Sequence, residues 1–174
     1  MSEKKLKLGI IGMGRVSMAH ADATKELNKQ VKLVAIAELR AERAKEMAEA
    51  LGVKKVYTDY RELLKNPEIE AVIICLPNYL HHPVCIEAAR AGKHILVEKP
   101  MCMNLAEADE MISEANKHAI TLMVGQSRRF SWRCRRSLIE LMKSDSRSES
   151  TSLFLYIFIN RRPTGGRVQK KQED

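Results

Sequence analysis

Five short apolar runs, separated by amphipathic stretches, constrain the fold of this chain more than any other feature. The runs are Leu8–Ile11, Leu33–Ile36, Ala71–Ile74, Ile95–Val97 and Leu122–Val124. Each is nearly continuous in apolar residues instead of alternating with polar ones, which is typical of parallel strands covered on both faces. Between two of them, Ala44, Met47 and Leu51 recur at helical spacing. The pattern predicts a β-α unit repeated about five times, and therefore an α/β fold with a doubly wound parallel sheet.

Helix ends can be placed from glycines and capping residues. Gly52 and Gly92 stand directly after two helical stretches, where glycine commonly ends a helix. Two further positions carry the spacing of a capping box: Asp59 with Glu62, and Asn104 with Glu107. We expect helices to begin at both.

Composition narrows the class of protein. The chain has 174 residues, of which 45% are apolar and 30% are charged, which suits one domain of ordinary size plus an appendage. No apolar run approaches the roughly 18 residues that span a bilayer, and the N-terminus lacks a signal-peptide cleavage pattern. We therefore expect no membrane association. The four cysteines form no C-x-x-C pair, which favours reduced thiols in the cytoplasm and no metal site.

The net charge of +8 is concentrated near the C-terminus. Residues 1–126 carry 18 Lys and Arg against 17 Asp and Glu, a balance of +1, whereas residues 127–174 carry 12 against 5, a balance of +7. In this basic segment, arginines surround Phe130 and Trp132. Basic and aromatic residues together can bind single-stranded nucleic acid. No recognised nucleic-acid-binding motif accompanies them, so we do not expect nucleic acid to be the partner.

The sequence Gly12-x-Gly14-x-x-Ser17 follows the first apolar run and precedes a helical stretch. This is the spacing of a dinucleotide-binding fingerprint with a small residue at its third position. Gly12 permits a tight turn, Gly14 lets a pyrophosphate approach the backbone, and Ser17 allows close packing of helix against strand. The first amides and the positive end of the helix then bind phosphate. A plain glycine loop is the alternative, and the position between strand and helix favours the nucleotide.

An acidic residue stands where this fingerprint requires one. Glu38 comes directly after the second strand region, 24 residues beyond Gly14. A carboxylate there accepts both hydroxyls of an adenosine ribose and repels a 2′-phosphate. The sequence therefore predicts NAD as the cofactor. Arg40 leaves NADP open, because a guanidinium two residues later can bind a 2′-phosphate.

Two further motifs follow the glycine turn in order. They are Cys75-Leu-Pro-Asn78 with His81, and Ala91-Gly-Lys-His-Ile-Leu-Val-Glu98-Lys99-Pro100. Together with the glycine turn they resemble the glucose–fructose oxidoreductase/inositol dehydrogenase (Gfo/Idh/MocA) family, from about Lys7 to about Met142. The resemblance implies an NAD(P)-binding Rossmann domain over residues 1–126. Residues 127–174 would be the truncated start of a second α/β domain, the one that binds substrate and forms oligomers.

The resemblance also implies a role for each matching residue. The pyrophosphate would be cradled by Gly12, Met13, Gly14, Arg15 and Val16, and the ribose would be held by Glu38. The groove from adenosine to nicotinamide would be lined by Leu76, Pro77, Asn78 and His81. Glu98 and Lys99 would stand beside the nicotinamide, with Lys99 as the catalytic residue that polarises the substrate hydroxyl. Two alternatives stay open: Lys99 as a solvated surface lysine, and His81 as a residue that starts a helix.

The later part of the chain departs from the family pattern. Members of the family carry an Asp and a His in the second domain, and no His follows His118 here. We therefore expect the chain on its own to lack that general base. The apolar run Leu153–Ile159 resembles the first strand of the second domain, and an apolar strand without neighbours favours self-association.

Two functions follow from these observations. The first is an NAD(P)-dependent oxidoreductase of the sugar and polyol dehydrogenase type, incomplete as an enzyme on its own. It would transfer a hydride between nicotinamide and a secondary hydroxyl. The second is a non-catalytic module that binds or senses a dinucleotide. The sequence leaves open whether these 174 residues catalyse a reaction by themselves.

Overall fold

A computed structural model describes residues 4–127 of the chain. The chain divides at Gln126 into two units, and the described residues are essentially the first of them. The predicted start of a second domain, its aromatic and arginine residues, Cys134 and the apolar run 153–159 lie outside the described residues.

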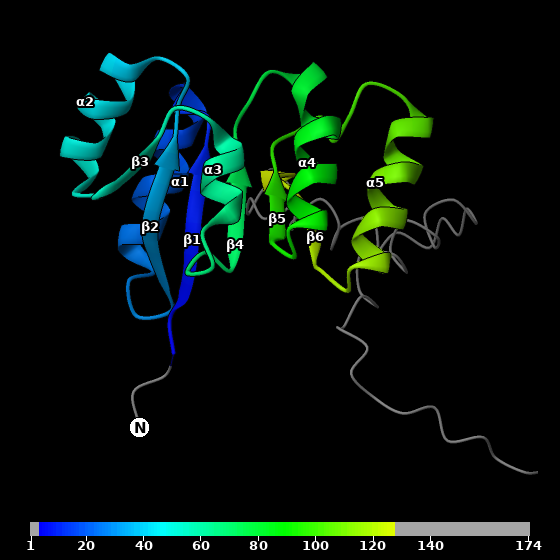
Figure 1. The fold of residues 1–174 in the computed structure, drawn as a ribbon, viewed down its shortest axis with the longest axis horizontal. Helices are drawn as coiled ribbons and strands as arrows, with labels where there is room; N and C mark the ends of the chain where they lie inside the picture. Colours follow the sequence, from blue (N-terminus) through cyan, green and yellow to red (C-terminus); the bar gives the residue numbers. More distant parts are fainter. Residues whose placement is uncertain (1–3, 128–174) are drawn as a thin grey trace, which may run out of the picture. The chain divides into compact units, whose positions relative to one another are not determined.

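Six parallel strands form one sheet in the order β3-β2-β1-β4-β5-β6. Their bounds are β1 (Leu6–Ile11), β2 (Val31–Ala37), β3 (Lys55–Tyr57), β4 (Ala71–Ile74), β5 (His94–Val97) and β6 (Leu122–Val124). The strand order changes direction between β1 and β4, and this position is the topological switch point of a doubly wound sheet. The predicted Rossmann-type α/β fold is confirmed (Figure 1).

Helices connect the strands and cover both faces of the sheet. They are α1 (Arg15–Glu26), α2 (Ala41–Leu51), α3 (Tyr60–Lys65), the 3-10 turn η1 (Asn78–Leu80), α4 (His81–Arg90) and α5 (Leu105–Lys117). Alternate strand residues enter two separate cores. Ile74 packs in one core with residues of α3, α4 and α5, whereas Ile73 packs in the other with residues of α1 and α2. Figure 1 shows α4 and α5 side by side over the β5 and β6 end of the sheet.

The sequence analysis missed one strand, β3. It has three residues, Lys55, Val56 and Tyr57, and pairs in parallel with β2 at the edge of the sheet. Val56 is 39% exposed, because an edge strand has a neighbour on one side only. Such a strand needs no continuous apolar run, and the pattern used to find the other five strands does not detect it.

The predicted helix starts are correct, but neither forms the full reciprocal capping box. Asp59 and Asn104 are the N-caps of α3 and α5, and each side chain accepts a backbone N–H from the first turn. The return bonds differ from the prediction. Glu62 pairs with a lysine one turn further along α3, and Glu107 accepts the backbone N–H of Met103. The helix ends after α2 and α4 are also as predicted, because Gly52 and Gly92 both have positive φ.

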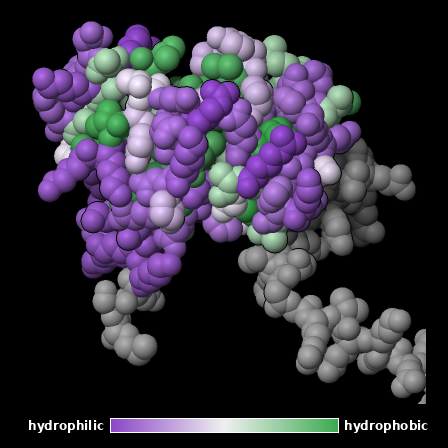
Figure 2. Space-filling model, viewed as in Figure 1, coloured by the Kyte–Doolittle hydropathy of each residue, from purple (hydrophilic) through white to green (hydrophobic). Residues whose placement is uncertain are grey.

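The described surface is largely polar. Figure 2 shows hydrophilic residues over most of the visible face, with hydrophobic side chains scattered among them. Within residues 4–127, none of the helices combines the length and the hydrophobicity needed to cross a bilayer.

Candidate cofactor-binding site

The turns that follow β1, β2, β4 and β5 meet on the side of the sheet where the carboxyl ends of the strands lie, which we call the carboxyl edge. In a parallel sheet all strands end on the same side, so residues far apart in the sequence gather there. The predicted site residues all lie in these turns or in the first turn of the next helix.

Gly12 brings the turns after β1 and β4 into close contact. Its φ is +89°, and an added Cβ would lie 2.5 Å from the backbone oxygen of Cys75 and 2.9 Å from a methyl carbon of Leu76. The Gly12 amide also donates to the carbonyl of Ala37 at the end of β2, at 2.8 Å. Three strand ends are therefore joined at a position where only glycine fits.

Gly14, in contrast to Gly12, has open space where a Cβ would lie. It is the N-cap of α1, and an added Cβ would meet no other heavy atom within 4 Å. No side chain caps this end of α1, so the helix itself leaves the amides of Arg15 and Val16 without acceptors. Ser17 is fully buried against the sheet, and its hydroxyl donates to the Gly14 carbonyl at 2.6 Å. A backbone face that is open and rich in amides fits a bound pyrophosphate.

Glu38, directly after β2, lies between the glycine turn and Arg40. Its carboxylate accepts the backbone N–H of Met13 at 2.9 Å and the Arg40 Nε–H at 2.8 Å. Burial by itself raises the pKa of Glu38, but the hydrogen bonds from Arg40 and Met13 outweigh it, and the pKa is lowered overall. The Met13 side chain is fully buried, so Met13 reaches the site through its backbone alone. An ionised carboxylate in this position is a suitable acceptor for the two hydroxyls of a ribose.

Leu76, Pro77 and Asn78 follow β4 and lie beside the glycine turn. Leu76 is half-buried, and Pro77 and Asn78 are exposed. His81 behaves differently, because its side chain is fully buried at the start of α4. Its two ring nitrogens lie 2.7 Å from the carbonyl oxygen of Pro100 and 2.9 Å from that of Leu76. His81 thus joins the turns after β4 and β5 from beneath the surface.

Glu98 and Lys99 follow β5. One carboxylate oxygen of Glu98 accepts the Lys99 backbone N–H at 3.1 Å, and the other lies 2.8 Å from Nε2 of His20. Burial, together with the negative charge of Glu98, raises the pKa of the Cys75 thiol to about 12. Lys99 is exposed, and no group within residues 4–127 makes a hydrogen bond or ion pair with its ammonium. Among the described residues its charge is therefore unpaired.

His20 is not among the site residues predicted from the sequence. The histidine lies on α1, three residues after Ser17 and therefore on the helix face turned toward the sheet. The sequence feature that could have indicated His20 is a polar ring at a helix position that faces the sheet. Its partner, 78 positions away, was not visible from local spacing.

The other three histidines of the described part contact residues that are not among the predicted site residues. His82 pairs with Glu110, His118 pairs with Glu114, and His94 accepts a backbone N–H from Thr121. Within residues 4–127, no group of three or more His, Cys, Asp or Glu side chains is arranged to hold a metal ion.

The fold and the site together define a dinucleotide-binding Rossmann domain. The family model for the oxidoreductase family with an NAD-binding Rossmann fold (GFO_IDH_MocA) matches residues 6–126. The chain therefore belongs to the Gfo/Idh/MocA oxidoreductase family, and its described domain is of the NAD-binding type.

Known relatives agree with this assignment. Myo-inositol 2-dehydrogenase from Thermotoga maritima is 40% identical over 125 residues, which cover 72% of this chain and 37% of that protein. The NAD⁺-dependent scyllo-inositol 2-dehydrogenase of Bacillus subtilis is 34% identical over 74% of this chain and 37% of its own length. Scyllo-inositol dehydrogenase from Lactobacillus casei, solved with NAD(H) and scyllo-inositol, matches with a TM-score of 0.75 at 27% identity, covering 80% of this chain and 42% of that one. The chain thus spans well under half the length of these relatives.

Proposed function

We propose that this chain supplies the NAD-binding half of an oxidoreductase that acts on a polyol or sugar. The observation that carries the proposal is the pairing of an open glycine turn with the Glu38 carboxylate at the switch point of the sheet. The Met13 amide, within the glycine turn, donates a hydrogen bond to the Glu38 carboxylate, so one dinucleotide can reach both features. The inositol substrates of the relatives support a polyol as the substrate class.

In this proposal, different residues of the carboxyl edge bind different parts of the cofactor. Gly12 and Gly14 shape the turn, and the first amides of α1, including those of Arg15 and Val16, bind the pyrophosphate. Glu38 accepts the ribose hydroxyls. Leu76, Pro77 and Asn78 form the side of the groove, and the buried ring of His81 lies beneath it, with Nε2 2.9 Å from the carbonyl oxygen of Leu76.

Lys99 is the catalytic candidate among the described residues. The bound nicotinamide would supply the hydride acceptor, and Glu98 and Lys99 would lie beside it. An ammonium next to the substrate hydroxyl stabilises the negative charge that develops on oxygen as its proton leaves. The exposed position of Lys99, with its ammonium uncommitted within residues 4–127, suits this task.

Cofactor choice gives the first test. Glu38→Ala removes the acceptor for the ribose and releases Arg40, which Glu38 now holds at 2.8 Å. We expect NADH affinity, measured by fluorescence titration, to fall on the order of tenfold while NADPH affinity rises. Adding Arg40→Ala should remove the gain for NADPH. Glu49→Ala, which removes an exposed carboxylate from α2, is the matched control and should change neither affinity. Unchanged NADH binding by Glu38→Ala would contradict the assignment.

Turnover gives the second test. The full chain is incubated with NAD⁺ and a panel of polyols that includes myo-inositol and scyllo-inositol, and NADH formation is followed by absorbance. Turnover that is lost in Lys99→Met would support an oxidoreductase with Lys99 in its site. NADH binding without any turnover would favour the non-catalytic nucleotide-binding module instead.

A further inference from the structure

His20 connects two parts of the carboxyl edge that are not adjacent in the sequence. It lies on α1, and its Nε2 is 2.8 Å from Oε1 of Glu98, which follows β5. The two side chains are 21% and 16% exposed, so the contact is largely shielded from water. Because an ionised carboxylate only accepts hydrogen bonds, the ring donates its Nε2–H. A shielded, charge-assisted bond of this kind is stronger than one on the open surface.

Glu98 is restrained on three sides. His20 holds one carboxylate oxygen, and the Lys99 backbone N–H holds the other. Gly125, after β6, lies close enough that an added Cβ would be 3.2 Å from Oε1 of Glu98. The carboxylate therefore has a defined orientation, set mainly by a side chain on α1.

The turn that contains Lys99 is thus held at both ends by histidines. His20 acts on Glu98, immediately before Lys99, and His81 bonds the carbonyl of Pro100, immediately after it. The Lys99 ammonium has no partner within residues 4–127. A backbone fixed on both sides of a lysine limits where its long side chain can reach.

We propose that His20 is a positioning residue, which acts through Glu98 to hold the nicotinamide half of the cofactor site in register with the pyrophosphate half. The inference rests on the proposed function. His20 and the phosphate-binding amides belong to the same rigid helix, so a bond from that helix to Glu98 fixes the distance between the two halves. Loss of His20 would release Glu98 and the Lys99 backbone and leave the pyrophosphate turn intact.

Comparing the binding of two ligands distinguishes a positioning role at the nicotinamide half of the site from a general role in supporting the fold. NADH spans both halves of the site, whereas ADP-ribose carries the adenosine and diphosphate but lacks the nicotinamide. We expect His20→Leu in the full chain to weaken NADH on the order of tenfold and ADP-ribose by less than about twofold. His20→Gln keeps an N–H donor of similar reach and should restore most of the NADH affinity. His118→Leu, which removes a partly exposed histidine bonded to Glu114, is the matched control and should change neither ligand.

A double-mutant cycle tests whether His20 acts through Glu98. If it does, His20→Leu should have little further effect on NADH affinity once Glu98→Ala is present. Thermal melting of each variant establishes that it is folded.

Four results would overturn the inference. If His20→Leu weakened the binding of NADH and ADP-ribose equally, His20 would be a structural support of α1. If the His20→Leu variant bound NADH with wild-type affinity, His20 would have no role in the site. Additive effects in the double-mutant cycle would separate His20 from Glu98. A wild-type chain that binds neither ligand would refute the proposed function itself, and this inference with it.

Discussion

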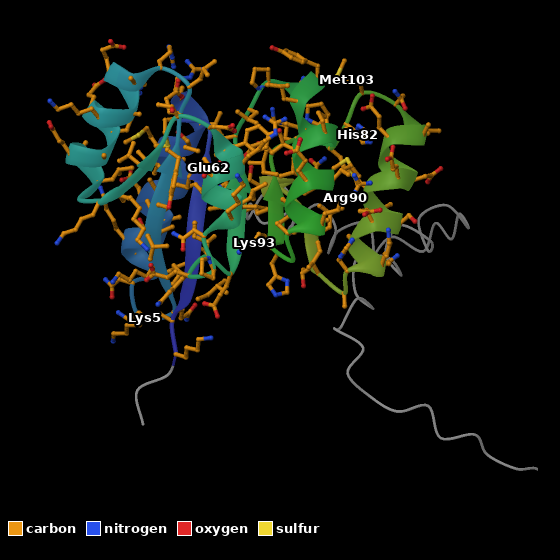
Figure 3. The ribbon with its side chains drawn as sticks, viewed as in Figure 1. Lys5, Glu62, His82, Arg90, Lys93 and Met103 are labelled. Atoms are coloured by element: carbon orange, nitrogen blue, oxygen red, sulfur yellow. The ribbon has the colours of Figure 1, made fainter. Side chains whose placement is uncertain are left out.

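The two edges of the sheet use charged residues in different ways. At the amino ends of the strands, the charged groups of Lys93 and Glu68 are bound to other groups of the protein. Lys93, before β5, is 7% exposed, and its ammonium donates to the carbonyls of Asn66 and Ile69 at 3.0 and 2.9 Å. Glu68 pairs with both Lys7 and Lys55. Figure 3 shows Lys93 lower in the view than Met103, which lies near the start of α5.

At the carboxyl edge, several bonding groups remain uncommitted. The Gly14 side of the turn is open, no side chain caps α1, and the Lys99 ammonium has no partner within residues 4–127. The same sheet thus has one edge whose polar groups stabilise the fold and one whose polar groups are available to a ligand. Substitutions at the first edge should alter stability, and most substitutions at the second should alter binding.

The largest effect is expected at Gly12, a carboxyl-edge position where a substitution should alter stability as well as binding. Gly12→Ala places a Cβ 2.5 Å from a backbone oxygen at a φ of +89°. We expect a loss of roughly 3 kcal/mol or more in the free energy of unfolding, together with loss of NADH binding. Urea denaturation and fluorescence titration measure the two. A stable Gly12→Ala variant would show that the turns after β1 and β4 separate easily.

Gly14→Ala is the matched control for that experiment, because its Cβ meets nothing within 4 Å and its φ is −78°. The free energy of unfolding should change by less than about 1 kcal/mol, since the restriction of the unfolded chain by alanine is opposed by the poor fit of alanine at an N-cap. NADH affinity should nevertheless fall on the order of tenfold, because the methyl group occupies the space of the pyrophosphate. Equal effects of the two alanines on stability would contradict the distinction.

At the amino edge, Lys93→Met should reduce stability without changing binding. Methionine fills a similar volume but donates nothing, so the carbonyls of Asn66 and Ile69 lose a charged donor. We expect a loss of about 2 kcal/mol in the free energy of unfolding and unchanged NADH affinity in the folded protein. Lys54→Met, at an exposed lysine, controls for the loss of charge. A drop in NADH affinity would mean that the two edges are coupled.

Sequence patterns predicted the parts of the fold that depend on local periodicity. Five strands and the glycine turn were placed correctly, because a strand buried on both faces must be continuously apolar and a turn with positive φ favours glycine. The edge strand β3 was missed, since its partial exposure removes that requirement.

Contacts between distant residues could not be predicted in the same way. The predicted role of Met13 did not indicate that its amide donates to Glu38. His81 was expected to line the groove or to start a helix, and the structure buries it between two carbonyls while it also begins α4. These partners come from other strand ends, and only the three-dimensional arrangement of the sheet brings them together.

Acid should affect the amino edge through Glu68. Hydrogen bonds from Lys55 and Lys7 lower the pKa of Glu68 from 4.5 to about 2. A carboxyl with a depressed pKa stabilises the folded state fully above its unfolded pKa, and the contribution is lost as the pH falls from about 4.5 toward about 2. The melting temperatures of wild type and Glu68→Gln should therefore converge over this range. The ion pairs are partly exposed, so added salt should reduce the difference. A constant difference at every pH would assign the effect of Glu68 to packing.

The smallest effect concerns cysteine reactivity, and it tests the contact between the turns of the carboxyl edge. Burial raises the pKa of both Cys75 and Cys85 to about 12, so at pH 8 the reactive thiolate is on the order of one molecule in ten thousand. Cys75 and Cys102 are both half-buried, but the pKa of the Cys75 thiol is raised by burial and by the negative charge of Glu98. Iodoacetamide labelling followed by peptide mass spectrometry should modify Cys102 before Cys75 and Cys85, and should reach those two only in denaturant. Rapid labelling of Cys75 in the native protein would mean that the turn after β4 moves away from Gly12, and the carboxyl edge would then be formed only when a ligand binds.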